Sequence, residues 1–201
     1  MKSLQPKRIQ LVRHAKLAVD PSGLFVGRTE LKACPTSTQQ LATSFQNTEF
    51  DALVSSPLQR CQTLAEQVAA YKGLKVETLD SLQERDWGSW DGLNTAEINP
   101  QDLQAYYDDP FNYSIPQAES WNEMRERLNQ AWCSLLNHPA QNLLCVTHGG
   151  VLRLLMQQIL GLSDHALFQF KLDYGVQLVL EVTPTPTQPF VQLIEIRPAN
   201  L

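Results

Sequence analysis

The sequence predicts an α/β fold in which helices cover both faces of a mostly parallel central sheet. Short apolar runs alternate with amphipathic stretches of helical length along the 201 residues, as in a parallel sheet wound with crossover helices. The last two apolar runs are joined by a short segment rich in proline and threonine, which leaves no room for a crossover helix. We therefore expect a three-layer α/β/α sandwich with an antiparallel edge strand formed by a late hairpin.

Local signals place the individual elements. Ser120 and Glu123 have the spacing of a capping box at the start of a helix. Ser56 is the expected N-cap of an earlier helix with Pro57 in its first position, and Gly161 is expected to close a later helix. The strands are expected in the run that begins at residue 9 and at residues 52–55, 74–79, 143–147, 176–182 and 190–196, and the helices at residues 38–45, 58–71, 120–136 and 150–160.

The composition indicates a single domain. The chain is 43% hydrophobic, enough for one substantial core, and its net charge of -5 argues against a nucleic-acid or anionic-membrane partner. No segment approaches the roughly 18 apolar residues of a membrane span. We expect a soluble, cytoplasmic protein with reduced, structural cysteines, and the composition leaves a homodimer open.

Residues 94–117 differ in character from the rest of the chain. They are polar and aromatic, and three prolines divide them into short pieces. We expect them to form a cap-like insertion over one face of a single domain that spans residues 1–201. The segment contains four acids and no lysine or arginine, so this cap would bring no cation to a ligand.

The first strand ends in Arg13 and His14. In open α/β sheets the carboxyl ends of the strands carry the ligand chemistry. An arginine can hold an oxyanion with two parallel hydrogen bonds, and an imidazole can act as nucleophile or proton carrier near neutral pH. Because an isolated pair of this kind is more often a simple surface cap, the prediction of an anion site depends on the other strand ends.

Two further strand ends carry matching residues. The run at 143–147 leads into His148 and Gly149 at a helix start, whose backbone N–H groups and positive dipole end favour bound phosphate. The run at 52–55 leads into a helix that carries Arg60, whose side chain can lean back toward the same edge. Each segment alone also fits a capped helix start or a solvated arginine. Together, two guanidinium groups and two imidazoles fit a tetrahedral dianion.

Between residues 82 and 92, acids alternate with tryptophans and glycines. Glu84 is the candidate proton donor for a leaving alkoxide, because a carboxyl group beside tryptophan can have its pKa raised by desolvation. For Asp86 and Asp91 the alternative also stays open that they are solvated acids in a turn whose tryptophans pack against the core.

These segments, in this order, resemble the histidine phosphatase superfamily, also called phosphoglycerate mutase-like, over nearly the whole chain. The family's signature arginine and histidine correspond to Arg13 and His14, and its Ser-Ser-Pro-Leu-x-Arg motif is intact at residues 55–60. Its Leu-x-Glu acid falls at Glu84 and its second histidine at His148.

The resemblance implies a phosphoglycerate mutase-like fold and a phosphatase reaction. His14 would attack phosphorus and become a phosphohistidine, while Arg13, Arg60 and His148 would bind and neutralise the transferred group. Glu84 would protonate the leaving oxygen, and water would then release phosphate. The resemblance implies no metal and no cofactor.

Within the superfamily, three short stretches look most like the alpha-ribazole phosphatase branch, whose members remove a phosphate late in cobalamin assembly. They are residues 14–19, 25–29 and 172–175. The resemblance therefore implies a small phosphorylated metabolite as substrate, with alpha-ribazole 5'-phosphate as the specific candidate.

The sequence departs from the family pattern beside the nucleophile. Ala15 stands where glycine is usual, and Lys16 where an acid or glutamine is common. The alanine is compatible with the family's turn unless a positive φ is required. The family's Gly-x-Thr-Asp loop is altered at residues 27–30. The candidate substrate contacts in these two stretches are Lys16, Gly27, Arg28 and Thr29.

Two alternatives remain open from the sequence. A cofactor-dependent phosphoglycerate mutase would return the phosphoryl group to its substrate and should carry extra basic residues in the cap, which residues 94–117 lack. A silent module would bind phosphate ligands without turnover if the changes at Ala15 and Lys16 had removed activity. The presence of all five core residues argues against such a module.

Overall fold

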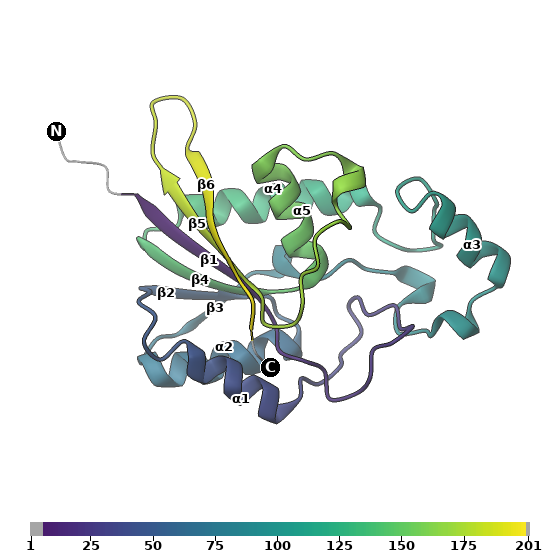
Figure 1. Ribbon diagram of the computed structural model, residues 1–201, viewed down its shortest axis with the longest axis horizontal. Coiled ribbons are helices and arrows are strands. Elements are labelled where there is room, and N and C mark those ends of the chain that lie inside the picture. Colours follow the sequence, from purple (N-terminus) through teal and green to yellow (C-terminus); the bar gives the residue numbers. More distant parts are fainter. Residues whose placement is uncertain (1–5, 200–201) are drawn as a thin grey trace.

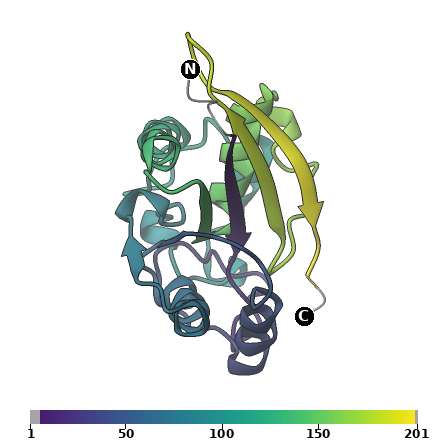
Figure 2. The ribbon, with the colours of Figure 1, turned by 90° about the vertical axis from the view of Figure 1, so that its left-hand side faces the viewer.

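The computed structural model describes residues 6–199 and confirms the predicted three-layer α/β/α fold (Figure 1). The strands are β1 (Lys7–Arg13), β2 (Ala52–Ser55), β3 (Val76–Thr78), β4 (Asn142–Thr147), β5 (Gln177–Thr183) and β6 (Phe190–Arg197). They form one sheet in the order β3-β2-β4-β1-β5-β6. The first four strands are parallel, whereas β5 pairs antiparallel with both β1 and β6. The predicted hairpin is therefore confirmed, and it forms one edge of the twisted sheet (Figure 2).

Helices cover both faces of this sheet. On one face lie α1 (Pro35–Ser44) and α2 (Gln59–Lys72), and on the other lie α4 (Trp121–Asn137) and α5 (Gly149–Leu160); α3 (Pro100–Asp108) lies off the sheet. Successive side chains of a strand point to opposite faces. Leu11 accordingly packs in the core under α4 and α5, and Val12 in the core under α1 and α2. Figure 1 shows these two helical layers on either side of the sheet.

Two predicted helix ends are confirmed by their hydrogen bonds. The Ser120 hydroxyl accepts from Glu123 N at 3.2 Å, and the Glu123 carboxylate accepts from Ser120 N at 2.7 Å, which completes the capping box of α4. Gly161 ends α5 in the left-handed conformation with φ 64°. These signals worked because all their partners lie within a few residues in sequence.

The predicted start of α2 is wrong by two residues. The helix begins at Gln59 with Leu58 as N-cap. The Ser56 hydroxyl accepts only a long hydrogen bond from Leu58 N, at 3.4 Å, and lies 2.7 Å from Nε2 of His148. An acid from a distant loop serves the helix instead, since Gln59 N donates to Glu30 at 3.0 Å. Arg60 is consequently the second residue of α2 rather than a full turn inside it.

The strand expected at residues 74–79 is also shorter than predicted. Only Val76–Thr78 pairs with β2. Gly73 ends α2 with φ 66°, and Leu74 N still donates to the helix carbonyl of Ala69 at 3.2 Å, so the chain becomes extended only after this turn.

Residues 94–117 contain a short 3-10 turn and α3, with Pro100 in the first turn of that helix. Several of their apolar side chains pack in a separate apolar cluster, whereas Phe111 packs against the core under α4 and α5. Figure 1 shows α3 beyond the end of the sheet. The buried members of this cluster are Phe25, Trp90, Ile98, Tyr106 and Ile115. The segment thus extends the molecule at the end where β1 finishes.

Two smaller findings concern the remaining predictions. None of the helices in residues 6–199 is both long and apolar enough to cross a bilayer. All four cysteines are free; Cys61 and Cys145 are buried, whereas Cys133 is exposed and therefore not part of the core.

Candidate active site

The carboxyl end of β1 is fixed by hydrogen bonds from both sides. His14 N donates to Thr147 O of β4 at 2.9 Å, and the His14 carbonyl accepts from Gly175 N at 3.2 Å. Arg13 N donates to Val176 O at 3.0 Å. Because β4 is parallel to β1, it delivers His148 to the same edge, and the rings of His14 and His148 lie edge to face with centroids 5.3 Å apart.

His14 is held in one tautomer. Its Nδ1 lies 2.8 Å from Ala15 O, and because a carbonyl can only accept, Nδ1 carries the proton and Nε2 keeps its lone pair. Burial lowers the pKa of His14 well below its ordinary value, and the charges of Arg60 and Arg13 act in the same direction. His14 is therefore neutral near pH 7, with Nε2 available as a nucleophile.

His148 is also buried and neutral. Burial, followed by the charges of Arg60 and other nearby groups, lowers its pKa well below the ordinary value. Its Nδ1 accepts from Nε of Arg60 at 3.3 Å, so Nε2 carries the proton and donates to the Ser56 hydroxyl. Arg60 therefore sets the tautomer of His148.

Arg60 is the largest fully buried side chain described, with 1% of its surface exposed. Besides His148, its guanidinium has two backbone acceptors: Nη2 donates to Gly27 O at 2.5 Å and Nη1 to Thr29 O at 3.0 Å. An arginine has five N–H bonds. Three are used here, so two remain for a bound anion.

Arg13 packs against the segment that leads into β5. Its Cζ lies 3.9 Å from the ring centroid of Tyr174, and Nη1 donates to Leu172 O at 2.6 Å. Its buried Nε has no acceptor among the described protein groups. At Gly149 an added Cβ would lie 3.2 Å from Cζ of Arg13. The absence of a side chain at Gly149 thus leaves room for this guanidinium at the start of α5.

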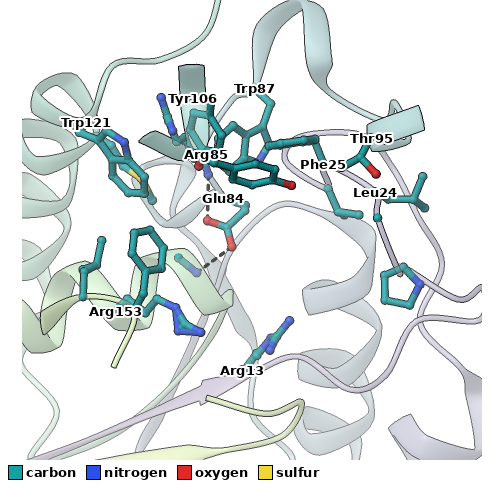
Figure 3. Close-up of a pocket in the computed structure, with 18 of the residues that line it drawn as sticks. Arg13, Leu24, Phe25, Glu84, Arg85, Trp87, Thr95, Tyr106, Trp121 and Arg153 are labelled. Carbon is teal, nitrogen blue, oxygen red and sulfur yellow. Dashed lines mark hydrogen bonds between the residues drawn. The ribbon is translucent and has the colours of Figure 1, made fainter. Parts of the chain in front are cut away.

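Glu84 reaches the same place from the far side. Its carboxylate accepts from its neighbour Arg85 N and from Gly150 N, both at 2.9 Å. A Cβ at Gly150 would overlap Oε1 of Glu84, so a side chain at this point of α5 would displace the carboxylate. Figure 3 shows the carboxylate with both hydrogen bonds, between Trp87 and Tyr106 on one side and Arg13 on the other.

A cavity of about 510 Å³ opens beside these residues. Arg13, Glu84 and Gly150 line it, whereas His14, Arg60 and His148 are buried and do not. Two more arginines, Arg85 and Arg153, contribute to its walls. Half of the remaining lining residues are aromatic: Phe25, Trp87, Tyr106, Tyr107, Trp121, Phe168 and Tyr174. The arrangement joins an anion site to a large apolar compartment.

Comparison with known protein families gives a match over most of the chain. The family model of the histidine phosphatase superfamily (branch 1) matches residues 9–194. The chain belongs to the histidine phosphatase superfamily.

Two relatives of this histidine phosphatase are named as phosphatases. The adenosylcobalamin/alpha-ribazole phosphatase of Escherichia coli (strain K12) is 26% identical over 183 residues, which cover 87% of this chain and 90% of the relative. Phosphoserine phosphatase 1 of Hydrogenobacter thermophilus is 26% identical over 185 residues, covering 87% of this chain and 86% of the relative. The family and these relatives identify the chain as a phosphatase enzyme.

Solved structures share the fold. The alpha-ribazole phosphatase from Shigella flexneri has a TM-score of 0.80 at 23% identity, covering 94% of this chain and 95% of that chain. A mycobacterial glucosyl-3-phosphoglycerate phosphatase has a TM-score of 0.75 at 20% identity, covering 89% of this chain and 91% of that chain. Both likenesses support the predicted phosphoglycerate mutase-like architecture.

The structure of this histidine phosphatase brings together Arg13, His14, Arg60, Glu84 and His148 but treats the four candidate substrate contacts differently. None of those four lines the described cavity. Gly27 and Thr29 hold Arg60 through their carbonyls, and Arg28 is exposed and pairs with Asp86 at 3.3 Å. Lys16 is exposed outside the cavity. Their roles as substrate contacts stay predictions.

Ala15 fits its position beside the nucleophile without strain. Among the described residues, Gln117 is the one non-glycine with a positive φ. The backbone at Ala15 is therefore in a conformation open to any residue, and the alanine is fully buried against the α1 and α2 layer. The turn at this place does not require the family's usual glycine.

Sequence reasoning missed three residues of this site. Arg153 follows Gly150 by three positions, so one helical turn places both on the same face of α5, and this spacing was a usable signal. Tyr174 covers Arg13 and His14 from a loop, with ring centroids of Tyr174 and His14 5.4 Å apart. It lies in the stretch 172–175 that resembles the alpha-ribazole phosphatase branch, but that resemblance did not place it in the site. Asp91, for which the sequence leaves a solvated turn open, is half-buried and accepts hydrogen bonds from backbone groups.

Proposed function

We propose that this chain hydrolyses phosphomonoesters through a phosphohistidine on His14, without a metal ion or cofactor. The observation that carries this proposal is the state of His14, a neutral imidazole whose Nδ1–H is bound to Ala15 O. A nucleophilic imidazole needs an unprotonated nitrogen, and this arrangement supplies it at Nε2. The cationic groups around it suit a phosphoryl group.

The reaction divides into two steps. In the first, Nε2 of His14 attacks phosphorus, the bond to the leaving oxygen breaks, and Glu84 gives its proton to that oxygen. Arg13, Arg60 and His148 bind the phosphoryl oxygens and offset their charge. In the second, water attacks the phosphohistidine, Glu84 takes a proton from the water, and inorganic phosphate leaves His14. The described residues hold no group of three or more His, Cys, Asp or Glu arranged to bind a metal ion; metal independence stays a prediction.

The aromatic compartment supports a substrate with a flat, apolar leaving group. Its seven aromatic residues offer ring faces and edges, and a cavity of about 510 Å³ has room for far more than a serine or glycerate. This favours alpha-ribazole 5'-phosphate over phosphoserine among the substrates named for the relatives. We propose alpha-ribazole 5'-phosphate as the specific candidate.

Residues 94–117 act as a cap in this proposal. Thr95, Tyr106 and Tyr107 of the segment line the cavity. The arginines of the lining all come from outside it, so the cap supplies aromatic surface and no cation. This disfavours a phosphoglycerate mutase, which has to hold a second anionic group. A cytoplasmic location and a homodimer stay predictions.

A phosphate-release assay tests the reaction and the substrate together. The wild type and His14→Ala are compared on alpha-ribazole 5'-phosphate, phosphoserine, p-nitrophenyl phosphate and 3-phosphoglycerate with a bisphosphate primer. We expect His14→Ala to lose at least ~10³-fold in kcat, because it removes the covalent route. We expect kcat/KM for alpha-ribazole 5'-phosphate to exceed that for phosphoserine several hundredfold, roughly 3 to 4 kcal/mol of transition-state binding.

His138→Ala, at the end of α4 and outside the cavity, is the control and should keep wild-type rates. Rapid quenching followed by mass spectrometry should find phosphate on His14 in the wild type. Phosphate release that survives in His14→Ala would overturn the covalent mechanism. Faster isomerisation than hydrolysis of 3-phosphoglycerate would replace the phosphatase assignment with a mutase, and equal rates on phosphoserine would overturn the aromatic leaving group.

A further inference from the structure

Asp91 collects hydrogen bonds from one loop. Its Oδ1 accepts from Gly27 N at 3.3 Å, from Thr29 N at 3.0 Å and from the Thr29 hydroxyl at 2.5 Å. Its Oδ2 accepts from Arg28 N at 2.7 Å and from Trp87 N at 3.4 Å. Every backbone N–H of residues 27–29 therefore points at this one carboxylate.

The same loop holds Arg60 on its other side. While the N–H groups of residues 27–29 face Asp91, the carbonyls of Gly27 and Thr29 accept from the Arg60 guanidinium. A Cβ at Gly27 would overlap Oδ2 of Asp91 and the carbonyl of Arg85, so the loop packs closely against both at this position. Three elements thus meet in one chain of contacts: Asp91, the loop and Arg60.

We propose that Asp91 is a positioning residue that acts through residues 27–29 to hold the Arg60 guanidinium in the phosphate site. The proposal rests on the function proposed above, in which Arg60 binds the phosphoryl group. Arg60 is also the residue that fixes the His148 tautomer, so a displaced loop would disturb two groups of the site together.

The ionised form of Asp91 is the one this role requires. Burial alone would raise its pKa, but the Thr29 hydroxyl and the N–H groups of Arg28, Thr29 and Trp87 outweigh burial and lower the pKa below its ordinary value. A carboxylate is an acceptor at both oxygens, whereas the amide of asparagine presents N–H donors at one end. Asp91→Asn would therefore turn an NH2 group toward backbone N–H groups of the loop.

A double-mutant cycle between Asp91→Asn and Arg60→Lys tests this route. We expect Asp91→Asn to lower kcat/KM on p-nitrophenyl phosphate about 10- to 100-fold, the usual cost of losing a partner that orients a binding group. When Arg60→Lys is already present, adding Asp91→Asn should lower kcat/KM by a further factor of less than about three, because the guanidinium that Asp91 positions is already gone. Calorimetric affinity for inorganic phosphate should show the same non-additivity.

Asp51→Asn is the matched control. Asp51 likewise accepts from a backbone N–H, that of Asn142 at 2.9 Å, but far from Arg60. Asp51→Asn should lower kcat/KM only slightly, and its fold-change should multiply with that of Arg60→Lys. If the fold-changes in kcat/KM of Asp91→Asn and Arg60→Lys also multiply, Asp91 has only a structural role and the proposal fails. The proposed phosphatase reaction would be unaffected by that result.

A second measurement needs neither turnover nor ligand. In protein labelled with 15N-arginine, the Nη signals of Arg60 should be resolved in the wild type and in Asp51→Asn, and averaged by rotation in Asp91→Asn. Unchanged Nη signals in Asp91→Asn would overturn the proposal even if the wild type proved inactive. If Asp91→Asn does not fold, Thr29→Val removes one of the five donors, and it should lower kcat/KM by a few fold with the same coupling to Arg60→Lys.

Discussion

Glycine at position 150 leaves space for the carboxylate of Glu84. The Gly150 N–H holds Oε2 at 2.9 Å, and no side chain can be added without overlapping Oε1. Gly150 thus acts in two ways: its N–H donates a hydrogen bond, and its lack of a side chain leaves room for the carboxylate. Both fix where the Glu84 carboxylate lies, and in the proposed mechanism this is the point from which the proton is delivered.

Gly150→Ala should impair the proposed proton transfer selectively. The added methyl displaces the carboxyl group, and a misplacement of about 1 Å can cost roughly 100-fold. We expect kcat/KM on an alkyl phosphate to fall about 10- to 100-fold, and to fall less on p-nitrophenyl phosphate, whose leaving group needs little protonation. Steady-state kinetics on both substrates measures the ratio.

The control for this prediction is Gly161→Ala. It strains the left-handed end of the same helix but meets no atom within 4 Å. It should cost about 1 kcal/mol of stability and leave the ratio of alkyl to aryl rates unchanged. An equal loss on both substrates in Gly150→Ala would contradict the role given to Glu84.

At this scale the sequence revealed the residues but not their partners. Arg13, His14, Arg60 and His148 were predictable because each lies at or soon after the end of an apolar strand, and these strands end at one edge of the sheet. The Ala15 carbonyl that sets the His14 tautomer was not, since a backbone acceptor has no sequence signature. Asp91 was missed because all its loop partners lie more than sixty positions earlier in the chain.

Lys7 joins the beginning of β1 to the end of α4. Its Nζ donates to Leu136 O at 2.8 Å and also contacts the carbonyls of Leu135 and His138. These carbonyls belong to the last turn of α4, where a cation also complements the helix dipole. Burial lowers the pKa of Lys7. One side chain thereby fastens the helix layer to the central strand.

Lys7→Met should destabilise the fold without changing the chemistry. It keeps the apolar stem but leaves the helix carbonyls without their donor, so we expect the free energy of unfolding to fall by about 1–3 kcal/mol. Rates at 25 °C should stay within twofold, because Lys7 and Arg13 lie at opposite ends of β1. Urea denaturation measures the stability change.

Lys72→Met is the matched control, because its exposed Nζ donates only to Gln46 O among the described acceptors. It should change stability by less than about 0.5 kcal/mol. If the two variants lowered the free energy of unfolding equally, the helix-end contacts of Lys7 would contribute no more to stability than the single contact of Lys72.

The predicted helix ends were correct where the capping groups lie close to the helix end in sequence. The box at Ser120 and the glycine at 161 placed two helix ends correctly. The start of α2 failed because Ser56 bonds to His148 and the acid at the helix start is Glu30, both brought there by tertiary structure. Short-range rules cannot foresee a competitor that arrives from another strand.

Over the whole molecule, two neutral histidines buried at one site make stability depend on pH. His14 and His148 both have pKa values well below the ordinary value, so neither takes up a proton in the folded state at mildly acidic pH. In the unfolded chain both titrate near 6.5. Below that pH the unfolded state binds more protons, and stability must fall.

The free energy of unfolding should therefore drop between pH 7.5 and pH 5.5. Each histidine contributes roughly 1.4 kcal/mol to this drop, about 2.7 kcal/mol for both. Denaturant titrations at the two pH values measure it. His14→Gln should remove about half of the drop, whereas His165→Gln, which alters an exposed histidine, should keep it. If the variant with both His14 and His148 replaced by Gln still showed the full drop in the free energy of unfolding, the drop would come from other groups.

The position of β1 between β4 and β5 also sets the order in which this chain can assemble. Helices α1 and α2 are synthesised soon after β1. The two strands that pair with β1, β4 and β5, are made only when synthesis has reached the last third of the chain. At roughly 5–20 residues per second, the apolar strand that carries His14 waits on the order of ten seconds on the ribosome without a partner. Newly made chains are therefore most vulnerable to aggregation in that interval, and translation slowed before β4 would lengthen it.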